Sequence, residues 1–209
     1  MAKRQRYEQS SNIDRETWRQ ILKAAEGLFL ARGYKGVSMK DVAEAVQVTP
    51  AALYYHFPQG KEDLFMSMLH AMFEEWAAGI SRVVAPTHNV RERLLLLTSY
   101  LLTLPVDHFP ALMQDAKEQI KDREKQHTIF RQLIGTVEQR IIEIFQQAID
   151  AGEITVNTSA TVLASMYQGM VISMLHQMHL PTENPEKIDA PRLASILVST
   201  LLDGIVRPV

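Results

Sequence analysis

The sequence predicts an all-α protein with a small N-terminal helical domain and a larger C-terminal one. Apolar residues recur at the 3.6-residue helical period, whereas no alternating strand pattern and no repeat is found. The clearest apolar stripe, between residues 61 and 84, consists of Leu64, Phe65, Met68, Leu69, Met72, Phe73 and Trp76. A chain of 209 residues can hold one or two domains, and we place the boundary between 1–60 and 61–209.

The first expected helix begins after Asp14, which serves as its N-cap, and ends at Gly33. One stripe of this helix is apolar and consists of Trp18, Ile21, Ala25, Leu28 and Phe29. Ahead of it, Lys3, Arg4 and Arg6 form a basic tail. This tail is either a disordered terminus that aids solubility or an arm that reaches DNA phosphates or the minor groove.

A helix-turn-helix pattern follows. Ser38 and Asp41 form an S-x-x-D capping box, which predicts a short helix over about 39–45. After a tight turn at 46–48, Thr49 as N-cap and Pro50 as first helical residue predict another short helix to about His56. Two short helices joined in this way can insert one of them into a DNA major groove. The alternative is an ordinary three-helix subdomain that binds nothing.

At these residues the chain resembles the TetR family of bacterial transcriptional repressors. The similar stretches, in order, are Leu28-Phe29-x-x-x-Gly33-Tyr34, 38–43 (SMKDVA), Val48-Thr49, 53–57 (LYYHF) and Lys61-Glu62-x-Leu64-Phe65. Several short motifs in the right order over about fifty residues are far more specific than any one of them. Two positions depart from the family pattern. Gln47 occupies a turn position that is usually glycine, and the loop 58–60 is one residue longer than the commonest form.

The resemblance implies DNA contacts around the second and third helices. It places Thr49, Tyr54, Tyr55 and His56 at the DNA and Lys61 against a phosphate. Because the third helix has no Arg, Asn or Gln, we expect sparse readout of base edges, with Gln47 and Lys40 as the polar candidates. The expected DNA-binding set is Lys40, Gln47, Thr49, Ala51, Tyr54, Tyr55, His56 and Lys61.

Further helices are expected over 61–84 (ended by Pro86), 90–104, 110–124, 126–151 (ended by Gly152), from Thr158 or Ser159 to 179, and over 192–206. The charged stretch 117–125 alternates in sign, which predicts a solvated face with a break. Asp115, Glu118 and Asp122 share one helical face. Lysines interleave with them, so we expect a solvated helix there and no catalytic group.

The last two helices are expected to form a dimer interface. Ser165, Gly169 and Ser173 recur every four residues, which lets another helix approach closely. The family resemblance implies dimerisation through the two C-terminal helices, and two half-sites require two recognition helices. The expected interface residues are Ser165, Gly169, Ser173, Val198, Leu201, Leu202 and Ile205. The alternative is that both helices pack only within the monomer.

A pocket for a small hydrophobic effector is expected between the C-terminal helices. Ten methionines are many for this length, and methionine adapts to variable apolar ligands, although such stripes also occur in plain cores. The expected pocket residues are Trp76, Tyr100, Met113, Phe145, Met166, Tyr167 and Met170. His176 and His179 lie one turn apart, but no carboxylate or cysteine completes a metal site, so we expect no metal.

Composition narrows the possible functions. The chain has no cysteine, which excludes disulfides and thiolate chemistry. No eighteen-residue apolar run and no secretory signal is present, so we expect a cytoplasmic protein. Residues 1–65 contain ten Lys/Arg against eight Asp/Glu, whereas 66–209 contain twelve against sixteen. A mildly basic N-terminal part suits a DNA reader.

No P-loop, G-x-G-x-x-G, G-x-S-x-G or H-E-x-x-H motif occurs, so we expect neither an enzyme nor a cofactor. The sequence therefore predicts a ligand-responsive, homodimeric regulator that binds double-stranded DNA at a palindromic operator, most simply a repressor. The alternative is a ligand-binding coactivator of the same fold that does not bind operator DNA itself.

Overall fold

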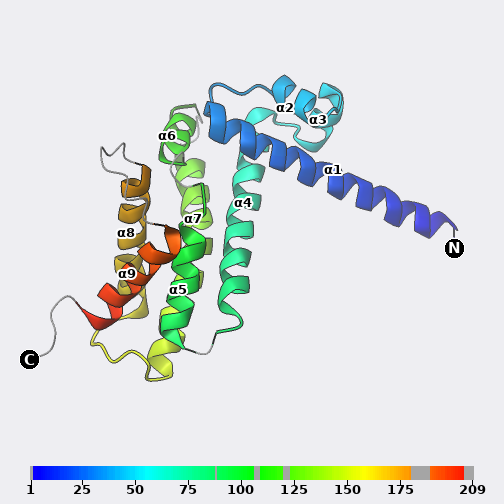
Figure 1. Ribbon diagram of the computed structural model, residues 1–209. Helices are drawn as coiled ribbons and strands as arrows, with labels where there is room; N and C mark the ends of the chain where they lie inside the picture. Colours follow the sequence, from blue (N-terminus) through cyan, green and yellow to red (C-terminus); the bar gives the residue numbers. More distant parts are fainter. Residues whose placement is uncertain (1, 88, 106–108, 120–122, 180–188, 205–209) are drawn as a thin grey trace, which may run out of the picture. The chain divides into compact units, whose positions relative to one another are not determined.

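The computed structural model describes residues 2–87, 89–105, 109–119, 123–179 and 189–204, and within these ranges it contains nine helices and no strand (Figure 1). The all-α prediction is confirmed. The helices are α1 (Ala2–Arg32), α2 (Met39–Ala45), α3 (Pro50–His56), α4 (Lys61–Val84), α5 (Val90–Leu101), α6 (Phe109–Gln119), α7 (Arg123–Asp150), α8 (Ala160–His179) and α9 (Ala190–Asp203). No helix among the described residues is long and apolar enough to cross a membrane.

The chain divides into two compact units that differ from a simple N-terminal and C-terminal split. Unit 1 comprises Met1–Phe73 and His108–Leu133, and unit 2 comprises Glu74–Asp107 and Ile134–Val209. The division therefore falls within α4 and α7. Helix α6, although distant in sequence, belongs to the unit that contains the helix-turn-helix.

Unit 1 is built around an aromatic cluster where α1, the loop after it and α4 meet. The Phe29 ring lies 5.1 Å from that of Phe65, edge to face, and the Tyr34 ring lies 4.8 Å from that of Phe65. Leu53 of α3 and Val42 of α2 are fully buried, which fixes the two short helices on this unit. Helix α2 packs against both α1 and α3, and α6 contacts α1 (Figure 1).

Unit 2 has a large apolar core to which α4, α5, α7, α8 and α9 contribute. Phe145 and Tyr167 are both almost fully buried, with ring centroids 5.8 Å apart. The Tyr167 hydroxyl lies 2.8 Å from Thr98 Oγ1, which itself donates to the Leu94 carbonyl. Helix α9 packs along α5 and contacts α8, and an Arg91–Asp203 ion pair joins α5 to α9.

Most predicted helix ends are confirmed within a few residues, and those of α2, α3 and α4 agree fully. The expected start of the first helix after Asp14 is wrong, because α1 already begins at Ala2. The segment 2–14 contains neither glycine nor proline, so nothing in it ends a helix.

The last helix also begins earlier than predicted. Asp189 is its N-cap, its side chain accepts from the Arg192 N–H, and Pro191 lies in the first turn. Ser159 rather than Thr158 caps α8, because its hydroxyl oxygen accepts from the Val162 N–H.

Candidate nucleic-acid interface

Helices α2 and α3 are each fixed by local hydrogen bonds. The Ser38 hydroxyl accepts from the Asp41 N–H at 3.2 Å, and the Asp41 carboxylate accepts from the Ser38 N–H at 2.7 Å, which confirms the capping box. The Thr49 hydroxyl oxygen accepts from the Ala52 N–H at 3.2 Å. Because a hydroxyl can also donate, Thr49 can cap α3 and donate to a phosphate at the same time.

The turn between the two helices depends on Gln47. Its φ is +57°, the one positive value at a non-glycine among the described residues. This left-handed conformation costs a side-chain-bearing residue about 1 kcal/mol. The turn is closed by the Val48 N–H, which donates to the Ala43 carbonyl at 3.0 Å. Glutamine at this position therefore adds an exposed polar side chain to the turn at an energetic cost.

The residues expected at the DNA lie on the surface of unit 1. Six of them are exposed, and two, His56 and Lys61, are half-buried. Tyr55 is 77% exposed, which is unusual for an aromatic side chain without a partner surface. Lys40 is already paired on its own helix, 3.6 Å from Glu44. Helix α3 thus presents Thr49, Ala51, Tyr54 and Tyr55 outward while Leu53 anchors it inward.

A basic hollow of about 690 Å³ opens beside α3. It is lined by Lys35, Val37, Ser38, Met39, Lys40, Tyr54, Pro58, Gln59, Gly60 and Lys61. The Lys61 ammonium lies 4.4 Å from the centre of the Tyr34 ring, a cation–π contact that positions it. Partial burial lowers the pKa of Lys61, while the carboxylates of Asp115 and Asp41 act in the opposite direction. Because three of the residues that line it are lysines, this basic hollow can accept a phosphate.

A second hollow of about 420 Å³ contains further basic residues. It is lined by Arg15, Trp18, Arg19, Tyr55 and His56. Sequence reasoning did not assign Arg15 or Arg19 to the interface, although their four-residue spacing places both on one face of α1. The α3 surface therefore has cationic side chains in both hollows that adjoin it, a distribution that suits a polyanion.

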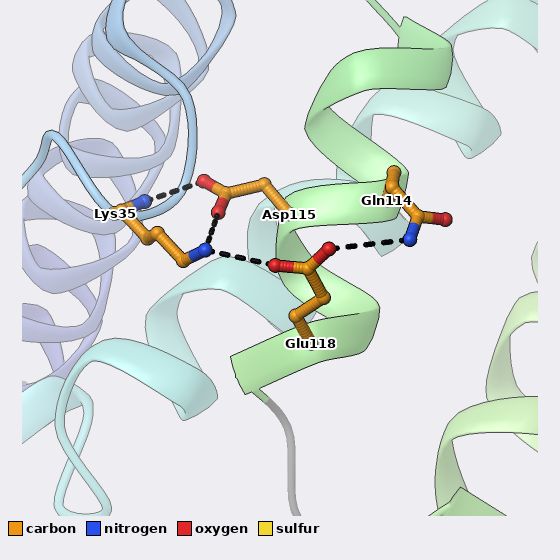
Figure 2. A network of polar contacts seen from close by, with 4 residues as sticks. All are labelled: Lys35, Gln114, Asp115 and Glu118. Atoms are coloured by element: carbon orange, nitrogen blue, oxygen red, sulfur yellow. Dashed lines mark hydrogen bonds and ion pairs between the residues drawn. The ribbon is translucent and has the colours of Figure 1, made fainter.

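Lys35, in the loop between α1 and α2, joins α6 to this surface (Figure 2). Its backbone N–H donates to Asp115 Oδ2 at 2.7 Å, and its Nζ lies 2.8 Å from Glu118 Oε2 and 3.3 Å from Asp115 Oδ1. Gln114 donates to the other Glu118 oxygen at 3.3 Å. The predicted solvated face holds for Glu118, which is exposed, whereas Asp115 is partly buried; sequence reasoning missed that the fold brings both carboxylates to Lys35. Asp122 lies outside the described residues.

The residues expected to line a ligand pocket fall in both units. Met113 is buried in unit 1. In unit 2, Tyr167 and Phe145 lie in the core, Met170 packs against it, and the Tyr100 hydroxyl donates to the Trp76 carbonyl at 3.4 Å. Burial raises the pKa values of Tyr100 and Tyr167, so both hydroxyls stay protonated near neutral pH. Met166 is 56% exposed on α8, so it does not belong to the buried core of unit 2.

The expected dimer residues are also distributed unevenly. Ser165, Gly169 and Ser173 are all exposed on α8, and Leu201 and Leu202 are half-buried on α9. Val198, by contrast, is fully buried in the apolar core of unit 2. Ile205 and the side chain of His179 lie outside what the structure describes, and His176 is exposed.

This geometry defines a helix-turn-helix DNA-binding protein with an all-α body. Residues 21–68 match the family described as bacterial regulatory proteins, tetR family. The chain is 24% identical over 163 residues to the HTH-type transcriptional regulator LmrA of Bacillus subtilis. The aligned region covers 74% of this chain and 84% of LmrA. Its helix-turn-helix region, residues 21–68, is thus that of the TetR family of bacterial transcriptional regulators.

Solved structures show that the fold of the chain is shared with other proteins. The transcriptional regulator FadR from Bacillus subtilis, in complex with stearoyl-CoA, superposes with a TM-score of 0.72 at 19% identity, covering 90% of this chain and 100% of that one. AibR, in complex with isovaleryl coenzyme A and operator DNA, superposes with a TM-score of 0.59 at 23% identity, covering 89% of this chain and 98% of that one.

Proposed function

We propose that this regulator is a homodimeric repressor that binds a palindromic operator and is released by a small hydrophobic effector. The observation that carries the DNA-binding part is the exposed face of α3 beside the basic hollow. Phosphates supply most of the affinity in such an interface, while a few side chains select bases. Thr49, Ala51 and Tyr55 can touch thymine methyl groups or the backbone, and Gln47 is the best-placed amide for base edges.

The test is selection of bound sequences from a random DNA pool, followed by binding measurements over a range of salt concentrations. We expect a pseudo-palindrome and an affinity that falls steeply as salt rises. Lys61→Ala should weaken binding to all sequences alike, whereas Gln47→Ala should change the preference at particular base pairs. Equal losses on operator and random DNA for both variants would contradict the role of Gln47. Failure of the wild type to bind any DNA would favour the coactivator alternative.

Dimerisation is supported by an exposed apolar stripe on α8. Val162, Met166 and Ile172 are 46%, 56% and 66% exposed, and together with the small residues Ser165 and Gly169 they lie on one side of the helix at intervals of three or four residues. Ile196 of α9 is exposed as well. Monomeric proteins rarely leave such a row of large side chains in water, so we infer that a second copy covers it.

The effector is proposed to carry an apolar chain, and acyl-CoA thioesters are the first candidates. Two proteins of similar fold were solved with stearoyl-CoA and isovaleryl coenzyme A. Methionine and aromatic side chains around Met170, Tyr100 and Phe145 would suit an acyl chain. A ligand that lowers operator affinity a hundredfold needs a coupling free energy of about 2.7 kcal/mol, which is typical for allostery.

The effector proposal is tested with a thermal-shift screen of fatty acids and acyl-CoA thioesters, followed by operator release. Met170→Trp should fill the pocket and give a stable protein that still binds operator but ignores the inducer. If Met170 is instead part of a filled core, the same change should overpack it and lower Tm sharply. A sharp fall in the Tm of Met170→Trp, together with no compound that stabilises the wild type in the screen, would contradict the proposed pocket.

A further inference from the structure

Lys35 combines two features that the helix-turn-helix alone does not explain. It lines the basic hollow together with Lys40 and Lys61, which points to a role at DNA. Yet its ammonium is held by Asp115 and Glu118 of α6 (Figure 2). We propose that Lys35 is a further phosphate-binding residue and that Glu118 competes with the DNA phosphate for it. This inference rests on the DNA-binding function proposed above.

The two carboxylates of α6 differ in what they hold. Asp115 is only 20% exposed and accepts the Lys35 backbone N–H, so it anchors the loop itself. A Cβ at Gly33 would lie 3.2 Å from the same Asp115 oxygen, which shows how closely this carboxylate approaches the loop backbone. Glu118 is 51% exposed and contacts the loop through the Lys35 ammonium. The Lys35–Glu118 pair can therefore open while Asp115 keeps the loop in place.

Exchange of Glu118 for a phosphate is favoured by the chemistry of both partners. An exposed ion pair contributes little net stability, and the lysine stem is long and flexible. Hydrogen bonds to Glu118 and Asp115 raise the pKa of Lys35, so its side chain remains charged over the whole physiological range. A phosphate in the basic hollow would also meet Lys40 and Lys61, whereas Glu118 offers one carboxylate to one lysine. Glu118 thus lowers the affinity for DNA without blocking the site.

The test compares binding of wild type and Glu118→Gln to a labelled duplex of random sequence over a salt series. Glutamine keeps the size of the side chain and removes its charge. We expect Glu118→Gln to bind about threefold more tightly and to steepen the salt dependence by about one phosphate contact. Lys35→Gln should abolish this gain, so that it weakens binding more in the Glu118→Gln background than in the wild type.

Glu143→Gln is the matched control. Glu143 is a partly exposed residue of α7 that pairs with Arg140, so its replacement changes the net charge equally at a residue that does not line the basic hollow. The inference is overturned if Glu118→Gln binds no more tightly than Glu143→Gln, or if its gain persists with Lys35→Gln. Weaker binding by Glu118→Gln would mean that the ion pair supports DNA binding, which also overturns it. If no variant binds DNA, the proposed function fails as well.

Discussion

The two units achieve order by different means. In unit 1 the short helices α2 and α3 are defined by side chains that bond the backbone of their own first turn, and polar groups of α6 hold the adjoining loop. In unit 2 order comes from a continuous apolar core, and the buried polar contact between Thr98 and Tyr167 is an exception within it.

This contrast follows from what each unit must present. A surface that reads DNA needs polar and cationic side chains at fixed positions in water, where burial cannot hold them, so local caps and ion pairs do so. A unit that binds an apolar ligand or a second copy needs volume and apolar surface, which a packed core supplies.

Truncation in the core of unit 2 should have the largest effect. Phe145 is 1% exposed and contacts the Tyr167 ring, so Phe145→Ala should lower the free energy of unfolding by about 3–5 kcal/mol. Leu96→Ala, on the exposed side of α5, should change it by less than about 0.5 kcal/mol. Urea unfolding measures both, and similar losses would mean that the core does not dominate this unit.

A charge on the exposed stripe of α8 should affect assembly rather than folding. Ile172→Glu places a carboxylate in the proposed dimer interface, where desolvation of an unpaired charge is unfavourable. We expect a monomer in analytical ultracentrifugation, an unchanged helical spectrum, and at least a tenfold loss of operator affinity. Val156 is exposed in the loop before α8, so Val156→Lys and Val156→Glu should leave the dimer intact. A dimer that survives Ile172→Glu would place the interface elsewhere.

Replacement of a helical glycine by alanine should change the stability of the protein in opposite directions in the two units. At Gly79 of α4 an added Cβ would lie 2.4 Å from the Tyr100 ring, so Gly79→Ala should cost about 1–3 kcal/mol of stability. At Gly27 of α1 nothing lies within 4 Å, so Gly27→Ala should stabilise by about 0.5–1 kcal/mol through helix propensity. Replacing Tyr100 with leucine should recover most of the Gly79→Ala loss, and its failure to do so would contradict the steric explanation.

Removal of the left-handed strain at Gln47 should change the stability of the protein by a smaller amount. Gln47→Gly removes the cost of φ +57° and should stabilise the protein by up to about 1 kcal/mol while it removes the amide from the DNA surface. Gln139→Gly, in the middle of α7, should instead destabilise by about 1 kcal/mol. Thermal unfolding measures both, and a loss at Gln47 would mean that its side chain stabilises the turn.

The smallest effect is expected from acid titration of the capping box. Hydrogen bonds from the Ser38 hydroxyl and backbone N–H lower the pKa of Asp41 below its value in the unfolded chain, about 3.9. Its stabilising contribution is therefore present above that value and is lost as the pH falls through the folded pKa. Asp41→Asn and Ser38→Ala should each flatten the acid limb of the stability curve. If both variants lose stability at acid pH as the wild type does, protonation of Asp41 does not contribute to that loss.

Local sequence patterns are enough to predict the parts of this protein that depend on neighbours within about four residues. Ser38 with Asp41, and Thr49 with Pro50, defined α2 and α3, and the glycine position of the family pattern located the left-handed Gln47. These groups bond one another along a helical turn, so residue type and spacing are sufficient to specify them.

Which side of each later helix is buried, and which distant segments meet, could not be predicted in this way. The tertiary structure buried Val198 and exposed Met166, and it brought Arg19 of α1 beside Tyr55 of α3. It also placed Asp115 against Lys35, eighty positions away in the chain. A helical period predicts that a helix has an apolar face. How the helix is rotated about its axis, and which elements it packs against, depend on how all the core side chains fill space together.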